Sequence, residues 1–101
     1  MNQTEFLQRL EEKFTKYLAV AKAKNSDYAD ESDAFKNFKM CEAYGVPAEK
    51  GILVRMSDKM TRFSNLLNRP ANVETESVID TLEDLSIYAT ILSILIQSRK
   101  T

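Results

Sequence analysis

Hydrophobic residues recur at helical spacing along most of the chain, and polar, turn-forming runs separate the helical stretches. The first stretch predicts a helix over residues 4–23, with the Thr4 side chain as its N-cap. Turn-forming residues then predict a polar loop over residues 24–33. A short helix is expected over residues 34–44. Gly45 suits its end, because glycine readily adopts the left-handed conformation that follows a helix.

Two longer helices complete the pattern. The first is predicted over residues 47–68, with Pro47 in its first turn, and an Asn-Arg-Pro run ends it. The second is predicted over residues 73–99, with Asn72 as its N-cap. Only two glycines and two prolines occur in the chain of 101 residues, and alternating strand patterns are scarce. The chain is therefore predicted to be a single all-α domain, residues 1–101.

Three acidic residues stand four residues apart at the start of the last helix: Glu76, Asp80 and Asp84. At about 100° per residue they form one acidic stripe on the helix. A predicted core face lies across from them and contains Val78, Leu82, Leu85, Ala89, Leu92 and Ile96. Carboxylates stacked in this way repel one another, so they suggest a bound Mg²⁺ or Mn²⁺. The alternative is a solvated helix face without a ligand.

The side of the helix that carries the acids turns apolar further along. Ile87, Ile91 and Leu95 continue this side toward the C-terminus. A helix that is apolar all round is buried on both sides, and a single chain offers few helices to cover it. We therefore expect a homo-oligomer, a dimer or a tetramer, in which a second subunit covers these residues.

Composition excludes several kinds of chemistry. The chain has no histidine and a lone cysteine, Cys41, so histidine-dependent nucleophiles, zinc sites and disulfide frameworks are excluded. Lys and Arg number 14 against 15 acidic residues, a net charge of −1, which argues against a nucleic-acid partner. No signal peptide or membrane-spanning run is recognised, which predicts no membrane partner and a location in the cytoplasm of a cell or of an infected host.

Polar and aromatic residues in the central part of the chain are candidates for nucleotide binding. In the predicted loop, Lys24 suits a phosphate, Asn25 a hydrogen bond, Asp27 a further acidic contact and Tyr28 stacking. The alternative is a plain surface loop.

The next two helices carry a second set of candidates. Asn37 and Phe38 would line a base pocket, or would simply belong to a packed helix. The basic residues of the following helix would form a phosphate clamp, with Asp58 as a fourth metal ligand. These basic residues are Arg55, Lys59 and Arg62. They could equally be solvated charges that bind no ligand.

Four segments, read in order, resemble a known family: K-N-S-D-Y, A-F-K-N-F, G-I-L-V-R-M-S-D-K-M-T-R-F and E-S-V-I-D-T-L-E-D-L-S-I-Y-A. Over residues 24–96 the chain is similar to the MazG-like all-α nucleoside triphosphate pyrophosphohydrolases, and above all to small members found in bacteriophage genomes. Asp80 and Asp84 match the first and last acids of that family's E-E-L-G-D-like segment. Thr81 replaces the second acid, and Arg55 and Asp58 stand near the positions where a pair of glutamates is expected.

The resemblance implies an antiparallel bundle of four to five helices and an oligomeric assembly. It also implies that Glu76, Asp80 and Asp84, with Asp58, bind Mg²⁺, which bridges the phosphates and activates a water molecule. Attack on the α-phosphate of a (deoxy)nucleoside triphosphate would release a monophosphate and pyrophosphate. Because the acidic set is incomplete, a second hypothesis is a non-cleaving phage protein that sequesters a nucleotide immune signal. A third is a helical interaction module.

Overall fold

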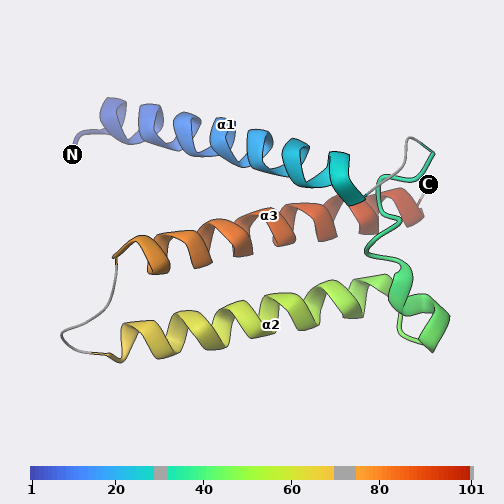
Figure 1. Ribbon diagram of the computed structural model, residues 1–101. Coiled ribbons are helices and arrows are strands. Elements are labelled where there is room, and N and C mark those ends of the chain that lie inside the picture. Colours follow the sequence, from blue (N-terminus) through green and yellow to red (C-terminus); the bar gives the residue numbers. More distant parts are fainter. Residues whose placement is uncertain (29–31, 70–74, 101) are drawn as a thin grey trace. The chain divides into compact units, whose positions relative to one another are not determined.

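The computed structural model describes residues 1–28, 32–69 and 75–100, and its regular elements within these ranges are all helical (Figure 1). They are α1 (Gln3–Tyr28), the 3₁₀ helix η1 (Met40–Tyr44), α2 (Ala48–Leu67) and α3 (Thr75–Lys100). The all-α prediction is confirmed. The chain divides into two compact units, Met1–Ala34 and Phe35–Thr101.

Helix α1 begins earlier and ends later than predicted. Asn2, and not Thr4, caps it: the Asn2 Oδ1 atom accepts a hydrogen bond from the Glu5 backbone N–H at 2.8 Å, and its Nδ2 atom donates to Glu5 Oε1 at 3.3 Å. The predicted stop after Ala23 is wrong, because the helix continues to Tyr28. Asn, Ser and Asp lower helix stability by less than about 1 kcal/mol each, which the last turn of a long helix tolerates.

The helix predicted over residues 34–44 is wrong in its first half, where residues 34–39 form turns that lead into η1. Gly45 ends η1 with φ at 83°, as expected, and its N–H donates to the Glu42 carbonyl at 3.1 Å. Pro47 then serves as the N-cap residue of α2. The predicted cap Asn72 lies outside the described residues.

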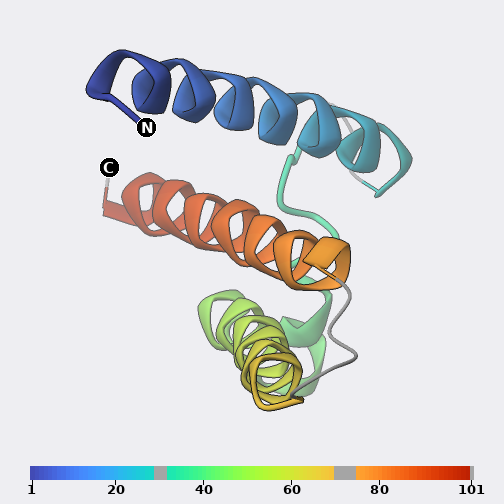
Figure 2. The same cartoon turned by 90° about the vertical axis from the view of Figure 1, so that its left-hand side faces the viewer.

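Helices α2 and α3 run antiparallel, side by side, in the second unit (Figures 1 and 2). Ala48, Ile52 and Leu95 form the buried centre of the contact. Half-buried side chains surround them: Phe35, Phe38, Met56, Tyr88, Ile91 and Leu92. Full burial of a residue such as Ile52 or Leu95 is worth about 1.5–3 kcal/mol relative to exposure in water.

The face of α3 that meets α2 differs from the predicted core face. Leu82, Ala89 and Ile96 were expected inside and are exposed. Leu95 was expected on the opposite side and is 1% exposed, covered within its own chain. The reason given for an oligomer was that Ile87, Ile91 and Leu95 would otherwise stay in water; it is wrong for Leu95, and Ile87 and Ile91 are half-buried within the chain. The oligomer itself stays a prediction.

Candidate functional site

The α2–α3 contact brings the two halves of the predicted site together. The Lys59 Nζ atom of α2 lies 2.9 Å from the Asp84 Oδ2 atom of α3. Lys59 occupies the side of α2 that faces α3, one or two turns from the core residues Ile52 and Met56. Both charged side chains are about one-third exposed, at 31% and 29%, so the pair lies at the rim of the contact and not inside the core.

The cation beside Asp84 is thus a lysine of the same chain. Asp84 was expected to bind a metal ion, and in the structure the ammonium group of Lys59 lies beside its carboxylate. An exposed or half-exposed ion pair of this kind contributes about 0–1 kcal/mol to stability. The pair therefore adds little to stability. It matters for the site, because it joins one residue of the basic motif to one residue of the acidic motif.

The remaining predicted metal ligands do not gather around this pair. Asp58 and Asp80 are exposed, and the Glu76 side chain lies outside the described residues. In residues 1–28, 32–69 and 75–100, no three His, Cys, Asp or Glu side chains are placed where they could hold a metal ion. The magnesium site stays a prediction, since the side chain of one of its proposed ligands, Glu76, is not described.

Thr81 occupies the position where the resembling family has its second acid. Its side chain is 2% exposed, and its hydroxyl donates to the Ser77 carbonyl at 2.8 Å within α3. A carboxylate in this buried position would need a charged partner or a metal ion. A threonine needs neither, because its hydroxyl is satisfied by a backbone carbonyl of the same helix.

Phe38, predicted to line a base pocket with Asn37, belongs to the packing around the core of the second unit. The Phe38 ring packs against the core centre, and the guanidinium carbon of Arg55 lies 5.0 Å from the ring centroid. This is a cation–π contact. Asn37, which precedes Phe38 in the chain, is half-buried, and Phe35 also packs on the core. Arg62 is exposed on α2.

The other nucleotide-binding candidates belong to the first unit. Lys24, Asn25, Asp27 and Tyr28 form the last turn of α1 and not a loop. Lys24 is exposed, and the side chains of the other three lie outside the described residues.

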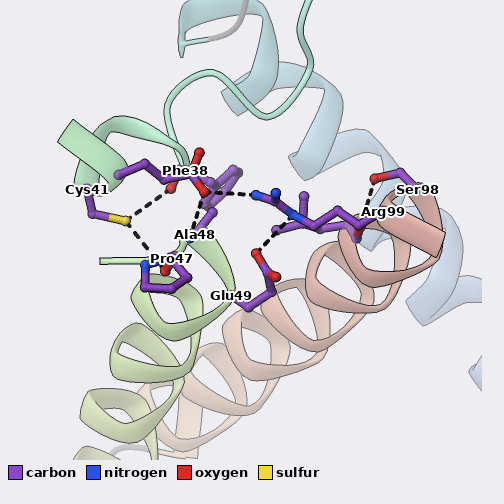
Figure 3. A network of polar contacts seen from close by, with 9 residues as sticks. Phe38, Cys41, Pro47, Ala48, Glu49, Ser98 and Arg99 are labelled. Carbon is purple, nitrogen blue, oxygen red and sulfur yellow. Dashed lines mark hydrogen bonds and ion pairs between the residues drawn. The ribbon is translucent and has the colours of Figure 1, made fainter. Parts of the chain in front are cut away.

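One polar network was not predicted from the sequence (Figure 3). Arg99, in the last turn of α3, donates from Nη2 to Glu42 Oε2 at 2.9 Å. The Glu42 carboxylate also accepts a hydrogen bond from the first N–H of α2, that of Ala48, at 3.3 Å. The Arg99 Nε atom lies 3.1 Å from Glu49 Oε1, a buried oxygen that receives no hydrogen bond within the described part of the chain, so this contact is an ion pair only.

A signal for this network was present in the sequence. Glu49 is an acid in the first turn of α2, and Arg99 is a base in the last turn of α3. Each complements the dipole of its own helix, and an antiparallel pair places the two ends together. The contribution of Glu42 to the network could not be predicted from the sequence, because it depends on the presence of η1 before α2.

Comparison of the chain with family models, with curated proteins and with solved structures finds no match. The likeness to MazG-like proteins therefore stays an expectation from the four motifs. Separately, no helix in the described ranges is long and apolar enough to cross a membrane.

Proposed function

We propose that this protein binds a nucleotide through its phosphates, and that capture without cleavage is the function the geometry supports best. The observation that carries the proposal is the ion pair between Lys59 and Asp84 at 2.9 Å. It joins the basic motif of α2 to the acidic motif of α3, and its partial exposure leaves the lysine within reach of a ligand.

In this proposal the phosphates of the ligand replace Asp84 as the partner of Lys59. Arg62, three residues further along α2, lies on the same side of the helix and adds a second cation. Charge-assisted hydrogen bonds to phosphate are worth about 1.5–3 kcal/mol each, more than the exposed ion pair that is given up. The exchange is therefore favourable.

The second candidate is the hydrolase that the resemblance implies, a magnesium-dependent enzyme that cleaves a (deoxy)nucleoside triphosphate to monophosphate and pyrophosphate. This enzyme would need Asp84, together with Asp80 and Glu76, as ligands of the magnesium ion. The acid–base pairing in α2–α3 favours capture over this reaction, because Asp84 already has a cation and Thr81 stands where a further acid is expected.

We also propose that the protein forms the bundle of four to five helices that the family resemblance implies. The chain has three α-helices in its described residues, so a bundle of four or more helices would require a second copy. A homo-oligomer would meet that need.

One incubation separates the candidates. The purified protein is mixed with Mg²⁺ and a panel of nucleoside triphosphates, deoxynucleotides and cyclic dinucleotides, and the mixture is resolved by chromatography. Capture predicts intact ligand that elutes with the protein. Hydrolysis predicts monophosphate and pyrophosphate. Recovery of all ligands, free and intact, contradicts both.

Substitutions then test the proposed cations. Lys59→Ala and Arg62→Ala are each expected to weaken triphosphate binding by about tenfold or more while changing nucleoside binding little. Lys50→Ala is the matched control, since Lys50 is an exposed lysine on another side of α2. Equal losses for triphosphate and nucleoside would show that Lys59 and Arg62 do not contact phosphate.

A further inference from the structure

The cation–π pair of Arg55 and Phe38 places a flat, charged group on one side of α2. Both residues belong to the unit Phe35–Thr101. The guanidinium carbon of Arg55 lies 5.0 Å from the centroid of the Phe38 ring. The ring is half-buried and packs against the core, whereas Arg55 is exposed. One side of the planar guanidinium group therefore meets a fixed ring, and the other side meets solvent.

Arg55 shares its side of α2 with the two proposed phosphate-binding residues. Arg55, Lys59 and Arg62 follow spacings of four and three residues, which keep them on one side of a helix. Arg55 precedes Lys59 by four residues, a rise of about 6 Å along the helix axis. A ligand whose phosphates contact Lys59 and Arg62 can therefore extend along the helix, and its next group then reaches Arg55.

Aromatic side chains surround the Arg55 end of this row of bases. The contact between Lys59 and Asp84 sets the register of the antiparallel helices. Four residues further along α3, Tyr88 is level with Arg55 of α2. Tyr88 and Phe38 are both half-buried against the core. These surroundings suit a flat nucleobase better than a hydrated phosphate.

We propose that Arg55 is the residue on which the base of the nucleotide stacks, and that this stacking selects purine nucleotides. The inference rests on the nucleotide binding proposed above. The base covers the solvent side of the guanidinium group, and Phe38 is a positioning residue that supports the other side. Guanidinium groups stack on bases, as aromatic rings do. A purine covers more of the group than a pyrimidine, so it gains more from stacking.

This role of Arg55 differs from the one predicted from the sequence, which was a third phosphate contact. The two roles make different chemical demands. A phosphate contact depends mainly on positive charge, whereas stacking requires a planar group, which arginine has and lysine lacks. The substitution Arg55→Lys therefore separates them, because it keeps the charge and removes the plane.

Inorganic tripolyphosphate is the probe that separates the phosphates from the base. Isothermal titration of the full chain measures its affinity beside those of ATP, GTP, CTP and UTP. In the wild type the purine nucleotides should bind more tightly than the pyrimidine nucleotides. Arg55→Lys should lower the affinity for ATP and GTP by about tenfold, the order expected for loss of stacking on one base. Its affinity for tripolyphosphate should stay unchanged.

Arg62→Lys is the matched control, because it makes the same substitution at a proposed phosphate contact. It should change the affinities for ATP and tripolyphosphate by the same factor. Phe38→Leu tests the positioning role and should reduce the preference for purines, whereas Phe38→Tyr keeps the ring and should preserve it. A general loss of stability would not alter this preference, because all the nucleotides bind the same folded chain.

Each way in which the inference can fail gives a distinct result. Unchanged ATP affinity in Arg55→Lys, or equal losses for ATP and tripolyphosphate, overturns stacking on Arg55 while nucleotide binding stands. Equal wild-type affinities for purine and pyrimidine nucleotides overturn the selection of purines. A purine preference that survives Phe38→Leu overturns the positioning role. Failure to bind tripolyphosphate and every nucleotide would contradict the proposed function itself, and this inference with it.

Discussion

Gly51 lies against the sulfur of Cys41, where a side chain has no room. A methyl group added at Gly51 would lie 2.8 Å from the Cys41 Sγ atom. We predict that Gly51→Ala lowers the free energy of unfolding by about 1–3 kcal/mol, as overpacking does in other cores. Urea denaturation measures the difference.

Cys41→Ala provides the matched background for this change. Without the sulfur, the nearest atom to the new methyl group is the Cys41 Cβ at 3.9 Å, an ordinary contact distance. In that background Gly51→Ala should stabilise the chain by up to about 1 kcal/mol, the helix-propensity difference between the two residues. The same loss in both backgrounds would show that the sulfur is not what excludes the side chain.

Asp84 offers a second test on the scale of single residues. Asp84→Asn removes the charge that holds the Lys59 ammonium group at 2.9 Å. The free energy of unfolding should fall by about 1 kcal/mol or less, since the pair is partly exposed. If capture is the function, triphosphate binding should be retained or strengthened, because Lys59 no longer has to leave its carboxylate partner.

The hydrolase hypothesis predicts the opposite outcome for the same variant. Asp84→Asn, and likewise Asp80→Asn, would abolish magnesium-dependent release of pyrophosphate while helix content stayed the same. Wild-type turnover in both variants would show that these carboxylates hold no catalytic metal. Isothermal titration and a pyrophosphate assay on the same preparations distinguish the two hypotheses.

On the scale of elements, the Arg99 network ties together the ends of three helices. Arg99 at the end of α3 contacts Glu42 of η1 and Glu49 of α2, and Glu42 caps α2 at Ala48. Arg99→Ala should therefore cost about 1–2 kcal/mol of stability and speed hydrogen exchange in the first turn of α2. Lys100→Ala, which changes the neighbouring exposed base, is the control and should be neutral. Equal exchange rates in both variants would contradict the network.

The helices themselves could be predicted from the sequence, but the orientation of α3 about its axis could not. Ile87, Ile91, Leu92 and Ile96 place apolar groups on several sides of α3, so periodicity alone does not select the buried side. The partner helix selects it. Ala48 and Ile52 of α2 accommodate Leu95, and the ion pairs of Lys59 and Glu49 at the rim are compatible with the rotation that this packing selects.

The ends of the helices were also less predictable, because the sequence offers more than one suitable residue for the same position. Thr4 and Asn2 are both suitable N-caps, and only the geometry shows that the Asn2 side chain reaches the Glu5 N–H. For the site, the sequence predicted that Lys59 and Asp84 belong to one binding site, and the structure places the two side chains in contact. The sequence did not predict that they would pair with each other, because each was assigned to a different ligand.

For the molecule as a whole, ligand binding should appear as added stability. A nucleotide that binds only the folded chain stabilises it by about 2.7 kcal/mol at one hundred times its dissociation constant. In a chain of this size each kcal/mol raises the melting temperature by about 4–8 °C, so a captured nucleotide should raise it by roughly 10–20 °C. Differential scanning fluorimetry over the nucleotide panel measures this shift.

The same melting experiment, repeated with Mg²⁺ and with EDTA, distinguishes nucleotide capture from hydrolysis. Capture through Lys59 and Arg62 predicts an equal shift in Mg²⁺ and in EDTA, because lysine and arginine bind phosphate without a metal ion. A shift that requires Mg²⁺ would instead support a site built on Asp80 and Asp84. Loss of the shift in Lys59→Ala, but not in Lys50→Ala, would tie the stabilisation to the α2–α3 surface. The absence of a shift with every nucleotide, in a wild-type chain shown to be folded, would contradict nucleotide binding.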